Sequence, residues 1–329
     1  MIRWPLFLIA VLLSSPAFAQ AALPMGIVAD WAASPKLRWS PPALVNPTTI
    51  VLSGTPGVKT LNANTDYILQ CSGELSGELT IQYGRNVTLI GCHINGRLNV
   101  KYSTGIFYGE GLWITPPAQT DGISSAGNVT STGIIVLQNV RIDGLEGANT
   151  APLYNHTDCW QGHGVQTGLR IDRMTCGNNY QGLLLDGQSA IGFVELSRVN
   201  LYDPGPANAD GGNPSAGFWW LSSDQNNATK GNVPFRQECW RCYVRVRTGF
   251  NFSGKGYYPF AGITVGGVSV APYTTDAGVS MCWTAPMQLR GERRKDGTCS
   301  TVTAGDPPDG DFVPLATVDG TYVSPGYLK

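Results

Sequence analysis

His156 and Asp158 are the residues of this sequence whose types and spacing best fit acid–base chemistry. Residues two positions apart point to the same side of an extended chain, so both side chains can meet one substrate. A histidine can remove the proton next to a uronate carboxyl, and a neighbouring aspartate can orient the imidazole or bind a metal. The alternative is a turn in which Asp158 caps the backbone and His156 packs at a corner. His93 lies in a strand-like segment, and we expect it to be structural.

Asp121 is predicted to stack on Asp158. The segment Asp121-Gly-Ile aligns with Asp158-Cys-Trp and with Gln181-Gly-Leu. Neighbouring strands lie about 4.8 Å apart, and two carboxylates at that distance can share a proton or hold Ca²⁺. Paired carboxylates of glycosidases have a similar spacing, so the spacing does not exclude hydrolysis. The alternative is an aspartate ladder whose members are kept apart by backbone hydrogen bonds.

A small set of polar and aromatic residues is predicted to bind substrate. Gln161 and Gln181 are expected on one sheet surface with Lys101, whose charge would neutralise an acidic sugar. Trp219 is followed by a second tryptophan, so one of the two must point outward from a strand. The outward ring could form, together with Trp160, a platform on which a sugar ring stacks. Burial inside the fold is the alternative for these rings.

Short strands must position these residues, because the chain repeats a Gly-apolar unit from about residue 61. Two copies are Asn86-Val-Thr-Leu-Ile-Gly-Cys-His-Ile-Asn-Gly96 and Gly133-Ile-Ile-Val-Leu-Gln-Asn-Val-Arg-Ile-Asp-Gly144. Each copy resembles two short strands, apolar at alternate positions, that meet at a polar or glycine corner. A third short strand lies between copies, and the smallest repeat is about 20 residues.

Three strands per coil predict an all-β protein whose residues 61–270 form a parallel β-solenoid of about seven coils. In such a stack each coil covers the apolar face of its neighbour, and equivalent side chains lie above one another. A β-sandwich also has short alternating strands, but its antiparallel hairpins would not repeat head to tail.

The segment 86–96, its later copies and the run Asn155-His-Thr-Asp-Cys-Trp-Gln161 resemble the pectin-lyase-like superfamily of right-handed parallel β-helix proteins. The pattern His-x-Asp-x-x-Gln followed by Tyr180-Gln-Gly-Leu-Leu184 is similar to a subgroup of exported bacterial members with poorly defined activities. The resemblance covers about residues 61–270. It implies a groove along the first parallel sheet, where members cleave, epimerise or bind polysaccharides. Polygalacturonases carry an Asp-Asp pair and an Arg-Ile-Lys that this chain lacks, which argues against their type of hydrolysis.

The composition agrees with an exported β-rich protein. Glycine supplies 41 of 329 residues and only 14% are charged, which suits short strands joined by tight turns and excludes long charged helices. The net charge of −1 gives no basic field for a phosphate backbone, so no nucleic-acid partner is expected. Residues 1–19 resemble a signal peptide that ends in Ala17-Phe-Ala19. Because no later segment can span a bilayer, we expect a secreted or periplasmic protein.

All eight cysteines follow residue 19, and an even count in an exported chain predicts disulfides. The local pairings Cys71–Cys92 and Cys282–Cys299 are favoured, while the pairing of the other four stays open. Residues 20–60 are rich in Pro and Ala and are expected to form an irregular leader and N-terminal cap. Residues 271–329 are expected to form a C-terminal cap with a disulfide-closed loop.

These features predict a secreted carbohydrate-active protein that acts on an extracellular polysaccharide as a lyase, by β-elimination. His156 would be the base, and Asp158, Asp121 or a bound cation would offset the substrate carboxylate. A non-catalytic glycan-binding or adhesin-like β-helix and a polysaccharide epimerase are the alternatives, because each needs the same polar surface. We expect a monomer that has no membrane span.

Overall fold

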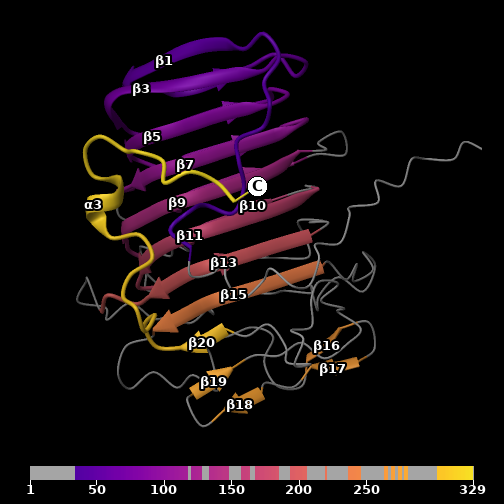
Figure 1. Cartoon of the computed structure of the whole chain (residues 1–329), viewed down its shortest axis with the longest axis vertical. Coiled ribbons are helices and arrows are strands. Elements are labelled where there is room, and N and C mark those ends of the chain that lie inside the picture. The colour runs from indigo at the N-terminus through magenta and orange to yellow at the C-terminus, as the bar shows by residue number, and fades with distance from the viewer. Residues whose placement is uncertain are drawn as a thin grey trace, which may run out of the picture.

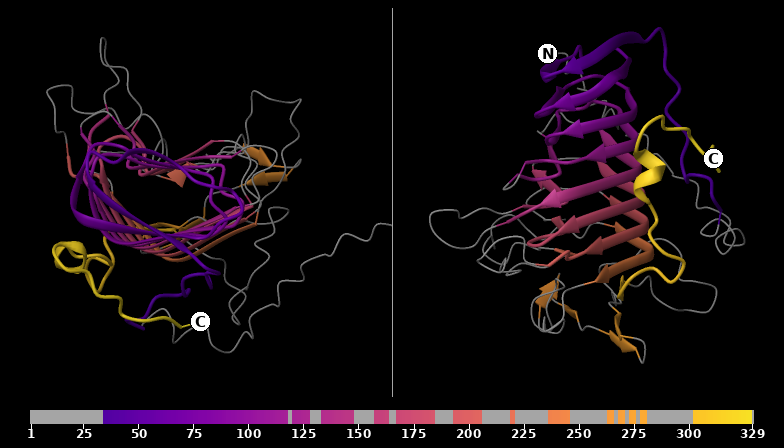
Figure 2. Two further views of the ribbon diagram at one scale, coloured as in Figure 1. Left: turned by 90° about the horizontal axis from the view of Figure 1, so that it is seen from above. Right: turned by 90° about the vertical axis from the view of Figure 1, so that its left-hand side faces the viewer.

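The structure is a computed structural model that describes residues 34–117, 120–127, 133–147, 157–163, 167–184, 193–205, 219–220, 236–245 and 302–328, and four short strands between residues 263 and 280. Almost all regular structure in these residues is β-strand, and most strands lie in two stacked parallel sheets (Figure 1). Seen from above, successive coils overlie one another (Figure 2). This arrangement is that of a parallel β-helix, as the repeat predicts.

The first sheet consists of seven short parallel strands that follow one another in chain order. They are β2 (Gly57–Thr60), β4 (Leu79–Gln82), β6 (Leu98–Lys101), β8 (Ile123–Ala126), β10 (Trp160–His163), β12 (Leu183–Leu184) and β14 (Trp219–Trp220). From β4 to β12 the first residues of the strands form one fully buried row: Leu79, Leu98, Ile123, Trp160 and Leu183. The interior of the helix is therefore a stack of apolar rows.

The second sheet has nine parallel strands and follows the same order. They are β1 (Thr48–Gly54), β3 (Tyr67–Ser76), β5 (Val87–Asn95), β7 (Ile106–Ile114), β9 (Ile134–Leu145), β11 (Gly168–Asn178), β13 (Phe193–Tyr202), β15 (Arg236–Arg245) and β20 (Val302–Ala304). Cys71 in β3 and Cys92 in β5 form a disulfide with a Cα–Cα distance of 5.6 Å, which confirms this pairing. Cys282 and Cys299 lie outside the described residues.

The strands from β5 to β15 each bend at one register position, where the backbone is left-handed. The φ angle lies between 49° and 68° at Gly91, Gly111, Asn139, Arg173, Arg198 and Arg241. Glycine adopts this conformation freely and asparagine tolerates it, whereas it is uncommon for arginine. Each long strand is thus two short strands that meet at a corner, and the prediction for the repeated unit is confirmed.

Two terminal segments run across the outside of the second sheet. The N-terminal strap (residues 34–39) precedes the first coil, and the C-terminal strap (residues 305–328) follows β20. The C-terminal strap contains α3 (Leu315–Val318), which lies against β5, β7 and β9 (Figure 1). The straps meet at a parallel bridge, where the Leu37 N–H donates to Gly326 O and the Leu328 N–H donates to Leu37 O, both at 2.8 Å.

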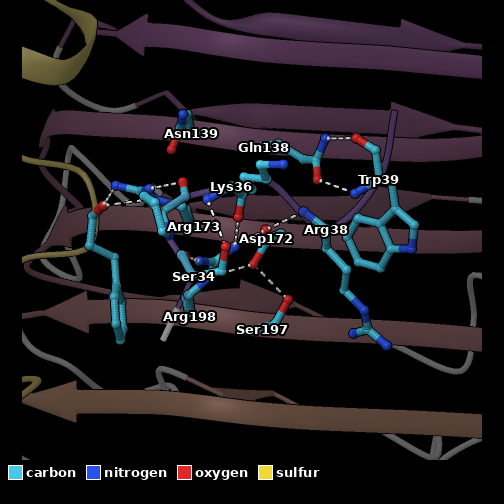
Figure 3. Close-up of polar contacts among 12 residues, drawn as sticks. Ser34, Lys36, Arg38, Trp39, Gln138, Asn139, Asp172, Arg173, Ser197 and Arg198 are labelled. Atoms are coloured by element: carbon cyan, nitrogen blue, oxygen red, sulfur yellow. Dashed lines mark hydrogen bonds and ion pairs between the residues drawn. The ribbon is translucent and has the colours of Figure 1, made fainter. Parts of the chain in front are cut away.

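Side chains at the corner of the second sheet bind the main chain of the N-terminal strap (Figure 3). Gln138 Oε1 accepts the Trp39 N–H at 2.9 Å, and its Nε2 donates to Trp39 O at 2.7 Å. Arg198 donates to two strap carbonyls and pairs with the buried Asp172 carboxylate. The strap is therefore held in place mainly by hydrogen bonds to its main-chain N–H and C=O groups.

Four fully buried polar residues stack beneath the straps, one in each of four coils. This polar column consists of Glu110, Gln138, Asp172 and Ser197. Glu110 accepts hydrogen bonds from Tyr322 and Tyr327 of the C-terminal strap, both at 2.8 Å. Because each buried polar group has a partner, the column can tie both straps to the solenoid without the cost of unsatisfied groups.

The stacked strands do not follow the predicted boundaries. They begin at Thr48, inside the expected leader, because β1 and β2 form an end coil that is mostly exposed and lacks a strong apolar period. Residues 263–265 and 268–270, expected in the solenoid, form the antiparallel pair β16 (Ile263–Val265) and β17 (Val268–Val270).

Further along the chain, β18 (Tyr273–Thr275) and β19 (Gly278–Ser280) form a second antiparallel pair. β20 then pairs in parallel with β15, so part of the predicted C-terminal cap joins the second sheet. The predicted signal peptide lies outside the described residues. In the part of the chain that is described, no helix has the length and apolar character needed to cross a membrane.

Candidate functional site

The outer surface of the first sheet, here called the first-sheet face, gathers polar side chains in two rows. Because residues alternate along a strand, the second and fourth residues point outward when the first and third are in the core. The second-residue row contains Thr80, Asn99, Ser124 and Gln161, and the fourth-residue row contains Gln82, Lys101, Ala126 and His163. Except for Gln161, the side chains of the second-residue row are only 2–5% exposed, so the accessible polar groups of the face are Gln161 and the polar members of the fourth-residue row. Lys101 and Gln161 therefore share one face, as the sequence predicts.

Asp121 and Asp158 lie in consecutive coils, just before β8 and β10. Their alignment is confirmed, because Ile123 pairs with Trp160 and the Asp158 N–H donates to Asp121 Oδ1 at 3.2 Å. Ser124 Oγ, from the second-residue row, donates to Asp121 Oδ2 at 3.0 Å. Asp121 is 5% exposed and Asp158 is fully buried. The two carboxyl groups thus form a buried pair at one edge of the first-sheet face.

The surroundings of this pair favour its protonated form. Burial raises the pKa of Asp121 above its usual value, and the Ser124 and Asp158 hydrogen bonds and the charges of Arg97 and His163 oppose that rise. Burial, and then the neighbouring Asp121 carboxylate, raise the pKa of Asp158 well above its usual value. Since two close carboxylates repel each other, the pair retains a proton to higher pH than a single exposed carboxyl.

Asp158 is held in place by the coil that follows. The side-chain amide of Gln181 lies 2.8 and 3.2 Å from the two carboxyl oxygens of Asp158. Cys159 forms a disulfide with Cys176, a pairing that the sequence left open. Asn178 donates to Thr157 O at 2.7 Å and to Gln181 O. A cross-link and a network of short polar contacts therefore fix the aspartate on both sides.

Arg97, Glu78 and His163 belong to the same face, although none of them is among the predicted site residues. Arg97 bridges the acids, because Nη2 lies 2.6 Å from Glu78 Oε2 and Nη1 lies 3.6 Å from Asp121 Oδ2. Burial would raise the pKa of Glu78, but hydrogen bonds from Thr80, Asn99 and Arg97 lower it to about 2. The signal that could have found these residues is the register between coils, which places them beside Asp121.

The pKa of Glu78 and the pKa values of the aspartate pair are therefore shifted in opposite directions. Glu78 is ionised and matched by Arg97, whereas the pair of Asp121 and Asp158 is biased toward holding a proton. Carboxyl groups whose environments push their pKa values apart can take different roles in one site. A neutral carboxyl can donate a hydrogen bond to an anionic substrate, which an ionised carboxylate cannot do.

Some predicted site residues are not part of this surface. Trp160 points into the core and is fully buried, so it cannot stack on a sugar bound outside; this corrects its prediction as a binding residue. His93 lies on the second sheet, where its ring stacks on Trp113 at 3.9 Å, in keeping with a structural role. His156 and the side chain of Trp219 lie outside the described residues.

The predicted Ca²⁺ site consists of Asp121 and Asp158. Within the described ranges, no group of three or more His, Cys, Asp and Glu side chains is placed to hold a metal ion. Two aspartates alone supply few of the six to eight oxygen ligands that Ca²⁺ prefers.

Comparison of the sequence with family models and with curated proteins finds no match, and comparison with solved structures finds none either.

Proposed function

We propose that this chain is a secreted or periplasmic member of the pectin-lyase-like β-helix class that acts on an acidic extracellular polysaccharide, by β-elimination. The parallel stack and the polar first-sheet face support this class of protein. Two disulfides are consistent with an oxidising compartment. Lys101 offers positive charge to uronate carboxylates along the face.

The observation that carries the proposal is the buried pair of Asp121 and Asp158 beside Arg97. In β-elimination a base removes the proton next to the uronate carboxyl, the electron pair forms a carbon–carbon double bond, and the glycosidic oxygen leaves and is protonated. Negative charge develops on the substrate carboxyl as the proton departs. A carboxyl that keeps its proton, together with a guanidinium, can stabilise that charge. His156 is the proposed base.

A non-catalytic glycan-binding protein is the second candidate, and one observation favours it. Asp158 is fully buried, and its oxygens are engaged by Gln181. A group with no exposed surface cannot touch a substrate unless its surroundings move. In this alternative the aspartates stabilise the coil stack, and the outward rows bind sugar without cleaving it.

An assay for the unsaturated product separates the two candidates. The protein is incubated with polygalacturonate and with alginate, and the ultraviolet absorbance of the product is followed. We expect wild-type activity, a loss of roughly a hundredfold or more in His156→Ala, and a large loss in Asp121→Asn. His93→Ala, which changes a histidine on the second sheet, is the matched control and should keep full activity. Binding to these polymers without any product would contradict the lyase proposal and support the second candidate.

A further inference from the structure

Tyr83 and Tyr102 occupy the same position in two consecutive coils, directly after β4 and β6. The Tyr83 N–H donates to Lys101 O and the Tyr102 N–H donates to Ala126 O, both at 2.8 Å, so each residue continues the ladder of the first sheet. Their ring centroids are 5.5 Å apart. Tyr83 is 36% exposed and Tyr102 is partly exposed. Two aromatic rings therefore lie side by side at the edge of the first-sheet face.

Both tyrosines have a left-handed backbone, with φ angles of 65° and 61°. This conformation is a genuine outlier for a bulky L-residue, and glycine adopts it without strain. In the next coil the same position is Gly127, whose N–H donates to His163 O. The turn at this position therefore accepts glycine.

The rings lie beside the fourth-residue row of the first-sheet face. Gln82 and Lys101 precede the two tyrosines directly, and His163 lies two strands from Lys101 in the same row. Two strand spacings amount to roughly 10 Å. The rings lie at the edge of the face where the strands end, whereas Asp121 and Asp158 precede their strands, so a sugar chain that lies on the rings and runs along the stack follows the opposite edge from the aspartates.

We infer that Tyr83 and Tyr102 form a platform on which sugar rings of an acidic polysaccharide stack, with Lys101 binding a carboxylate of the same chain. Aromatic faces are suited to the apolar faces of pyranose rings, and a lysine beside them selects for negative charge. This inference rests on the proposed function and adds a binding subsite that involves no acid–base chemistry. Tyr102 lies one coil from Asp121 and two coils from Asp158.

The test compares binding with stability, because the two explanations for the tyrosines differ there. Tyr83→Gly, Tyr102→Gly and the double variant are assayed by affinity electrophoresis in gels that contain polygalacturonate or alginate. We expect the double variant to bind about tenfold more weakly or worse, from the loss of two stacking contacts. Its Tm should stay within a few degrees of wild type, because glycine relieves the backbone strain. Tyr83→Phe and Tyr102→Phe keep the rings and should bind as wild type does.

Unchanged binding in the double glycine variant would overturn the platform and leave the proposed function standing. A large fall in Tm in each single glycine variant, with binding retained by the folded fraction, would also overturn it and assign the rings to stability. If the wild-type protein binds neither polymer, the proposed function fails and the platform fails with it.

Discussion

Replacing Asp172 with Asn should destabilise the protein strongly, because this carboxylate joins the N-terminal strap to the solenoid. It accepts hydrogen bonds from the Arg38 N–H at 2.9 Å, from Ser197 Oγ at 2.8 Å, and from two nitrogens of Arg198. Asparagine has a single acceptor oxygen, and its amide would face the guanidinium, which is 4% exposed. Removing one partner of a buried ion pair costs about 3–5 kcal/mol, and for a chain of this size Tm should fall by roughly 6–15 °C.

Chemical denaturation and limited proteolysis measure this effect. Trypsin cleaves after Lys and Arg, and both Lys36 and Arg38 lie in the strap, so faster cleavage there would report release of the strap. Ser197→Ala is the matched control, because it removes one hydrogen bond to the same carboxylate and should cost only about 1–2 kcal/mol. If Asp172→Asn lowered the free energy of unfolding by less than about 1 kcal/mol, the buried pair would not be what holds the strap.

Three further predictions concern charge and cross-links. The pKa of Asp158 is raised in the folded state, so the protonated side chain contributes stability that is complete at low pH and is lost as pH rises. The Tm of Asp158→Asn should therefore rise relative to that of wild type between pH ~4 and ~8. A difference in Tm that stays constant over this range would contradict the reasoning. Hydrogen bonds from Arg85 hold the pKa of Asp66 far below its usual value. Asp66→Asn should therefore lower the free energy of unfolding by about 1–3 kcal/mol at neutral pH, and by progressively less as pH falls through ~4. Denaturation at each pH measures this difference. Exchanging Cys159 and Cys176 for Ala should cost about 3 kcal/mol in the same assay, and no change would show that the cross-link does not constrain the unfolded chain.

Structural features that recur in every coil could be predicted from the sequence, because the residues that form them repeat along the chain. The alternation of apolar residues predicts the inward rows, and the alignment of Asp121 with Asp158 follows from the same register. That alignment also places Trp160 at the same position as Ile123, which faces the core. The burial of Trp160 could therefore have been predicted from the repeat.

Features that depend on one residue per coil could not be found in this way. The members of the polar column are separated by 25 to 34 residues, as between Gln138 and Asp172, and nothing in their local sequence distinguishes them from surface residues. The straps that cover them carry no repeat. Their place follows from contacts between segments more than a hundred residues apart, such as Arg38 with Asp172.

The bridge between the two straps brings the described ends of the chain together on one side of the solenoid. Leu37 exchanges two backbone hydrogen bonds with residues 326 and 328, and the two segments run parallel. A pulling force applied at residues 34 and 328 would load these bonds in shear, together with the side-chain contacts that join both straps to the coils. The coils would separate only after these contacts ruptured, so the mechanical resistance of the molecule to a pull on these residues begins at the straps.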